Sequence, residues 1–130
     1  MSVAFLFPGQ GAQESGMLRS LPRHPAIAAT LAEANRELEC ATDDLDSADA
    51  LRTTEGVQVA LFIAGVAGAR ALAAESIRPD FVAGMSVGAF AAAVVAGALD
   101  FLPALRLVRS RGRLMQAAYP SGYGMAAIVG

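Results

Sequence analysis

Residues 81–90 read FVAGMSVGAF, a short apolar run followed by a Gly-x-Ser-x-Gly motif and the start of an Ala-rich segment. The run 81–83 predicts a buried strand, and the segment that continues to about Gly97 predicts a helix. The turn between them is typical of a nucleophile elbow, in which a serine hydroxyl, here that of Ser86, projects above the edge of a sheet. An incidental serine in a buried Ala/Gly-rich turn is the alternative interpretation.

The surroundings of Ser86 decide whether it can react. The helix that follows the motif leaves backbone N–H groups free at its start, so the N–H of Val87 can stabilise an oxyanion. A serine nucleophile also needs a base. The only histidine, His24, lies between Arg23 and Pro25 at a loop–helix boundary, which favours a surface position. We therefore expect the base to be absent from this chain and His24 to be the less favoured candidate.

A second apolar run, residues 3–7, predicts another buried parallel strand. The Gly-rich loop 8–13 follows it, at the carboxyl edge where open α/β sheets bind ligands. The N–H of Gln10 in this loop is a candidate second oxyanion donor. The loop has neither the Walker lysine nor the Gly-x-Gly-x-x-Gly spacing, which disfavours a nucleotide-binding function.

Three longer segments predict helices. Residues 26–39 have the spacing of an amphipathic helix, and the Ala-rich residues 58–75 are apolar on nearly all sides, as in a deeply buried helix. Residues 101–118 predict a third helix, and the acidic residues 41–55 predict a surface connection that holds a short helix. Strands that alternate with helices indicate the α/β class with a parallel sheet.

The predicted helix 101–118 carries four arginines, and Arg111 differs from the others. Helical spacing puts Arg111 in a core-facing stripe and the other arginines, Arg106, Arg109 and Arg113, on the solvent side. The stripe consists of Ala104, Leu107, Val108, Leu114, Met115 and Ala118. A buried guanidinium needs an anion, and its planar fork suits a carboxylate. A structural salt bridge or a side chain whose tip reaches solvent is the alternative.

The composition narrows the function classes. The formal net charge is −2, and no basic stripe indicates binding to nucleic acid. Cys40 is the only cysteine, so neither an internal disulfide nor a Cys-x-x-Cys metal site is predicted, and a reducing compartment, the cytoplasm, is favoured. Residues 81–99 carry no charge, but their glycines favour a buried strand, turn and helix over a membrane span.

Four segments in this order resemble malonyl-CoA:acyl-carrier-protein transacylases and the acyltransferase domains of polyketide synthases. The segments are residues 5–13, 84–88, 109–116 and 124–130. The resemblance implies an α/β-hydrolase-like parallel-sheet subdomain, with residues 1–124 as its N-terminal part. Residues 125–130 are then the first strand of a small ferredoxin-like subdomain. Members of this family are about twice as long, so the chain is expected to be a truncated acyltransferase.

The resemblance also implies a transferase mechanism. Malonyl-CoA is the substrate, an acyl carrier protein with a CoA-derived arm is the acceptor, and neither a bound cofactor nor a metal is needed. The catalytic histidine would come from the part of the family fold that this chain lacks, so the chain alone is expected to be inactive. The implied site residues are Ser86 as nucleophile, Gln10 and Val87 as oxyanion hole, and Arg111, Gln58 and Met115 as substrate-binding residues.

Two positions depart from the family pattern. Met85 stands where a histidine is usual, and Ala89 stands where an acidic residue is usual. Together with residues 54–58, they make the chain more similar to the transacylase (epsilon) subunit of bacterial malonate decarboxylase. That subunit loads a carrier protein with a phosphoribosyl-dephospho-CoA-like arm and has other decarboxylase subunits as partners. The alternatives are a fatty-acid-synthesis transacylase, a serine thioesterase or hydrolase, and an inactive scaffold.

Overall fold

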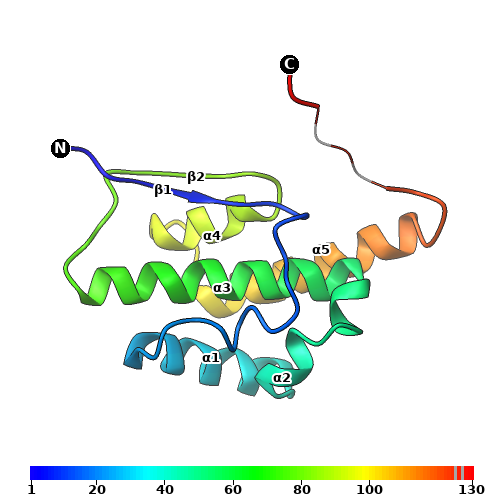
Figure 1. Ribbon diagram of the computed structural model, residues 1–130, viewed down its shortest axis with the longest axis horizontal. Helices are drawn as coiled ribbons and strands as arrows, with labels where there is room; N and C mark the ends of the chain where they lie inside the picture. The colour runs from blue at the N-terminus through cyan, green and yellow to red at the C-terminus, as the bar shows by residue number, and fades with distance from the viewer. Residues whose placement is uncertain (125, 127) are drawn as a thin grey trace.

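The computed structural model describes residues 1–124, 126 and 128–130. Its strands and helices alternate as expected for the α/β class (Figure 1). In chain order they are β1 (Ala4–Phe7), α1 (Pro25–Leu38), α2 (Thr42–Leu45), the 3-10 helix η1 (Ala50–Arg52), α3 (Thr54–Ala74), β2 (Phe81–Gly84), α4 (Gly88–Val95) and α5 (Phe101–Ala118). The predicted helices are confirmed, with ends that differ by a few residues.

The two strands form a parallel pair, as predicted, in a register that runs from Ala4 opposite Phe81 to Phe7 opposite Gly84. The helices lie on one side of this pair, with α4 next to the strands and α3 beyond it (Figure 1). The prediction that both strands are buried is wrong for the face of the strand pair that points away from the helices, where Leu6 is 76% and Phe81 is 66% exposed. The reason is that no helix of the described residues covers that face, so each strand alternates between covered and bare side chains.

Helix α3 is the centre of the molecule and contacts α1, α4 and α5. Because it is surrounded, its side chains are buried around most of its circumference, as its all-round apolar character predicted. Phe62 of α3 stacks on Phe101 of α5 with ring centroids 5.5 Å apart. The helix begins at Thr54, earlier than predicted, because Thr53 caps it by accepting a hydrogen bond from the N–H of Gly56.

The length and hydropathy of α3 would also suit a membrane span, with a mean hydropathy of 1.7 over its most apolar window. More than half of that window, 56%, is buried inside the fold. A core helix enclosed by other helices needs the same composition. The packing of α3 therefore explains its hydropathy without a membrane.

Helix α5 has the predicted bounds, but its buried stripe is rotated from the predicted one. Leu107 is 50% and Leu114 is 69% exposed, so neither belongs to the core. The residues that do face the core are Phe101, Ala104, Leu105, Val108 and Gly112. A small residue at 112 lets α5 approach α3 closely, and this contact sets the rotation of the helix. Arg111 consequently lies at the edge of the buried stripe and is half-buried.

The chain after α5 forms a loop through residues 120–124. The predicted strand 125–130 includes Met125 and Ala127, which lie outside the described residues. The described residues around them, Ala126 and 128–130, belong to no strand. A domain boundary at 124/125 stays a prediction.

The first test concerns the close contact of α4 with β1. Replacing Gly88 with Ala should lower the free energy of unfolding by about 3 kcal/mol, measured by urea denaturation. The physical reason is that the added Cβ would lie 2.2 Å from the backbone oxygen of Phe7, which cannot move without disrupting the strand. Gly68→Ala in α3 is the matched control, because its Cβ meets no atom within 4 Å. It should raise stability by about 1 kcal/mol through helix propensity alone.

Candidate active site

Ser86 lies in the sharp turn between β2 and α4 and has a φ of +53°. This left-handed conformation is unfavourable for a residue with a Cβ and is found where the surroundings enforce it. The predicted turn between a strand and a helix is therefore confirmed, and the structure adds that its serine is strained. The turn has the backbone form of a nucleophile elbow.

Two glycines make this turn possible. A Cβ on Gly84 would lie 2.1 Å from the carbonyl carbon of Gly88, and a Cβ on Gly88 would overlap the end of β1. Both distances are far below van der Waals contact, so any larger residue would force the backbone apart. The Gly-x-Ser-x-Gly spacing thus brings the serine, the end of β1 and the start of α4 together.

The loop after β1 packs directly on the elbow. The N–H of Met85 donates to the oxygen of Phe7 over 3.0 Å, and a Cβ on Gly9 would lie 2.9 Å from the oxygen of Met85. Within residues 1–124, neither the N–H of Val87 nor that of Gln10 donates a hydrogen bond. Since Val87 is 1% exposed, its N–H is a buried donor without an acceptor among the described residues, which is unusual in folded proteins.

Arg111 joins three elements at the candidate site. Its Nη2 donates to Ser86 Oγ over 2.9 Å, and its Nη1 donates to Gln58 Oε1 over 2.6 Å. The amide of Gln58, which is fully buried in α3, also contacts Met115 Sδ through Nε2 at 3.2 Å. The structure thus brings Ser86, Arg111, Gln58 and Met115 together.

The partners of Arg111 distinguish it from a structural ion pair. The arginine–carboxylate contacts within residues 1–124 all involve arginines other than Arg111, and the two groups that Arg111 binds are neutral. A guanidinium has five N–H donors, of which these contacts use only part. Its positive charge therefore has no carboxylate to balance it within the described residues.

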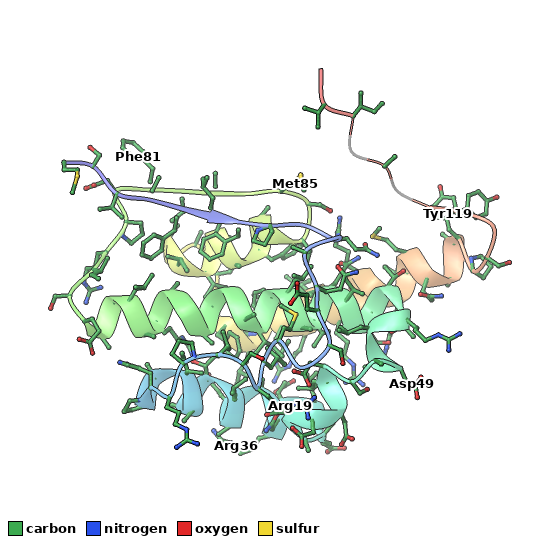
Figure 2. The ribbon with its side chains drawn as sticks, in the orientation of Figure 1. Arg19, Arg36, Asp49, Phe81, Met85 and Tyr119 are labelled. Atoms are coloured by element: carbon green, nitrogen blue, oxygen red, sulfur yellow. The ribbon has the colours of Figure 1, made fainter. Side chains whose placement is uncertain are left out.

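A cleft of about 520 Å³ adjoins these residues. Its lining consists of Gln10, Gly11, Thr54, Met115, Tyr119, Tyr123 and Gly124. Met115 thus connects the cleft to the Arg111 cluster, and Gln10 connects it to the loop beside the elbow. Tyr119 and Tyr123 pack edge to face with centroids 4.9 Å apart, and Figure 2 shows Tyr119 just beyond the end of α5. Sequence reasoning did not identify this pair, although two tyrosines four residues apart after a helix were visible.

Comparison with known proteins identifies the family. Residues 4–129 match the sequence model of the acyl transferase domain. The chain belongs to the acyl transferase domain family. The resemblance of the four motif segments to acyltransferases is therefore confirmed at the level of the family.

Several relatives of this chain are named malonyl CoA-acyl carrier protein transacylases. The chain is 42% identical over 133 residues to the malonyl CoA-acyl carrier protein transacylase of Bacillus subtilis strain 168, covering 98% of this chain and 42% of that protein. The solved malonyl transacylase of Streptococcus pneumoniae matches with a TM-score of 0.85 at 39% identity, over 92% of this chain and 40% of that one. A solved complex of a malonyl-transacylase with its type II polyketide-synthase acyl-carrier protein matches with a TM-score of 0.84 at 39% identity. The match covers 94% of this chain and 41% of that one. The chain thus spans about two fifths of the relatives' length.

His24 has a structural role in this acyl transferase domain. It is the N-cap of α1, where its Nδ1 accepts a hydrogen bond from the N–H of Ala26, and its Nε2 lies 3.2 Å from Glu75 Oε1. Neither contact involves Ser86. Among the described residues, the hydrogen-bond partner of Ser86 Oγ is Arg111, and no base contacts it.

The strain at Ser86 gives a second test. Ser86→Gly and Ser86→Ala both remove the hydroxyl and its hydrogen bond to Arg111, but only glycine relieves the positive φ. We expect the glycine variant to be more stable than the alanine variant by about 1 kcal/mol in urea denaturation. Equal stabilities would mean that the elbow of the folded protein is not strained.

Proposed function

We propose that this acyl transferase domain carries a malonyl group as an ester on Ser86 and passes it from malonyl-CoA to an acyl-carrier-protein thiol. The observation that carries the proposal is the 2.9 Å contact between the Ser86 hydroxyl and the Arg111 guanidinium, a cation to which the described part of the chain offers no carboxylate partner. A malonyl group has a thioester at one end and a carboxylate at the other. It can therefore react with the serine while its free carboxylate binds the arginine.

The chemistry is ping-pong acyl transfer. The Oγ of Ser86 attacks the thioester carbonyl carbon, a C–O bond forms, and the C–S bond to CoA breaks. The serine proton passes to a base outside the described residues and then to the departing thiolate. The thiol of the carrier arm next attacks the ester, its proton passes to the same base, and Ser86 regains its proton. No metal or redox cofactor enters this balance.

Arg111 supplies the selection for a dicarboxylic acyl group. A carboxylate can accept two parallel hydrogen bonds from the guanidinium fork, and the amide of Gln58 holds that fork in place. An acetyl group has no carboxylate, so it would leave the half-buried charge unpaired. That loss, about 3 kcal/mol, distinguishes malonyl-CoA from acetyl-CoA.

The N–H groups of Val87 and Gln10 are the proposed oxyanion hole. Support comes from their lack of acceptors within residues 1–124 and from the packing of the Gln10 loop against the elbow. Donors aimed at the developing oxyanion in a site sheltered from water stabilise the tetrahedral intermediate. Met115, which lies beside Gln58 and lines the cleft, would contact the acyl group.

The third test uses the natural full-length protein. Incubation with malonyl-CoA should add a malonyl group to the protein, and Ser86→Ala should abolish the adduct, both measured by intact mass. Arg111→Ala should lower the preference for malonyl-CoA over acetyl-CoA by about a hundredfold, the equivalent of about 3 kcal/mol. Arg106→Ala is the matched control, because Arg106 lies on the same helix and pairs with Glu37 at the surface.

Other outcomes would favour the other functions. An adduct on the Ser86→Ala variant would remove the serine from the mechanism, and unchanged selectivity in Arg111→Ala would make the arginine structural. Release of free malonate in the presence of a carrier protein would indicate a hydrolase or thioesterase. Absence of any adduct on the natural protein would indicate an inactive scaffold subunit and not a transferase.

We further propose malonate decarboxylase as the context of this transfer, with the other subunits of that enzyme as partners in the cytoplasm. Support comes from Met85, inside the motif, and Ala89, directly after it, the two residues that depart from the wider family pattern. Met85 is 62% exposed at the end of β2, and Figure 2 shows it projecting away from the helices, so it can contact an incoming carrier arm. Fatty-acid synthesis is the competing context, because relatives such as that of Bacillus subtilis are named malonyl CoA-acyl carrier protein transacylases.

The fourth test compares two acceptors. If the decarboxylase context is right, malonyl transfer to a carrier with a phosphoribosyl-dephospho-CoA arm should be about tenfold faster than transfer to one with phosphopantetheine. Met85→His combined with Ala89→Glu should reduce this preference, because it restores the residues usual in the wider family. Faster transfer to the phosphopantetheine carrier would assign the chain to fatty-acid or polyketide synthesis.

A further inference from the structure

Glu55, in the first turn of α3, binds the two arginines that flank Arg111. Its Oε1 accepts from Arg109 Nε over 2.9 Å, and its Oε2 accepts from Arg113 Nε over 3.0 Å. Arg113, whose side chain is 57% exposed, lies on the solvent side as predicted, whereas Arg109 is 37% exposed and partly buried against Glu55. Residue 55 was also the end of a predicted surface connection, so sequence reasoning missed its contact with α5.

The carboxylate of Glu55 is charged and partly buried between these helices. Burial raises the pKa of Glu55, but the hydrogen bonds and positive charges of Arg109 and Arg113 outweigh it, and the pKa lies below its usual range. Hydrogen bonds between an ionised carboxylate and guanidinium groups are stronger than neutral ones. The contact therefore holds the start of α3 to the middle of α5.

Two further contacts join the same parts of the helices. A Cβ on Gly112 would lie 2.6 Å from Glu55 Cα, so the two backbones touch at this point. The N–H of Thr54 donates to Gln116 Oε1 over 2.8 Å. Gly112, where the two backbones touch, directly follows Arg111 in the chain. Arg109 and Arg113, which bind Glu55, lie two residues before and two residues after Arg111.

These contacts fix the relation between Arg111 and Gln58. Gln58 follows Glu55 by three residues, so it lies about one helical turn further along α3. Its oxygen accepts from Arg111 at 2.6 Å, a distance that a small sliding or rotation of α5 against α3 would lengthen. The orientation of the guanidinium towards Ser86 thus depends on the contact between the helices.

We infer that Glu55 is a positioning residue for the carboxylate-binding Arg111, holding α5 against α3 through Arg109 and Arg113 so that the guanidinium faces both Gln58 and Ser86. The inference rests on the proposed function and deepens it, because it assigns part of the selection for malonyl groups to a residue that does not touch the substrate. Glu55 also binds both neighbouring arginines and offsets part of their charge, which leaves Arg111 as the arginine of this group without a carboxylate contact among the described residues.

The fifth test is Glu55→Gln in the natural full-length protein. This change keeps the shape of the side chain but removes the charge that holds both arginines. The preference of Ser86 acylation for malonyl-CoA over acetyl-CoA should fall by about tenfold, as a higher KM for malonyl-CoA, with the acetyl-CoA rate nearly unchanged. Arg113→Gln, which leaves the Arg109 contact in place, should give a smaller loss, and Arg113→Lys should recover most of the preference. The conservative arginine variants keep the test usable if Glu55→Gln folds poorly.

Glu37→Gln is the matched control. It makes the same chemical change and breaks the pairing of Glu37 in α1 with Arg106 in α5. That pair is remote from Gln58 in sequence and does not contact Glu55. Its selectivity should equal that of the unmodified protein. Loss of thermal stability in Glu55→Gln with an unchanged malonyl-to-acetyl ratio would overturn the inference and leave the proposed function intact. Failure of the unmodified protein to acquire any malonyl adduct would overturn both.

Discussion

The arrangement of the candidate site depends on one half-buried guanidinium that bridges three elements. Arg111 belongs to α5, its first partner Gln58 belongs to α3, and its second partner Ser86 belongs to the elbow before α4. A cation in this position is unfavourable unless it is well hydrogen-bonded, and neutral partners satisfy its donors without cancelling its charge. The same contact therefore supports the packing of the helices and leaves a charge for an anionic substrate.

The order of elements was predictable because it depends on local patterns. The Gly-x-Ser-x-Gly spacing predicted the turn, in which only glycine fits at 84 and 88, and an apolar run on each side predicted the strand and the helix. Arg111 was also identifiable, because a charged residue beside apolar neighbours at helical spacing requires a partner. The family resemblance implied Gln58 as a substrate-binding residue, but its hydrogen bond with Arg111 was not predicted.

The features that sequence reasoning missed depend on contacts between distant residues. The rotation of α5 follows from the close approach of Gly112 to Glu55, residues that are far apart in the chain, and helical periodicity carries no information about it. For the same reason the pairing of Glu55 with Arg109 and Arg113 was invisible, and Leu107 was assigned to the core. The strands were expected to be buried because apolar runs usually are, but burial depends on which elements cover a sheet.

The bare face of the strand pair has a consequence for handling the protein. Leu6 and Phe81 present apolar surface there, and a pair of strands has unpaired N–H and C=O groups along both of its outer edges. Such an edge is a template for adding another strand, and natural proteins normally protect it with charge, proline or a covering segment. A polypeptide limited to these residues is therefore prone to self-association that rises with concentration, and detergent or a fused strand that occupies the edge would suppress it.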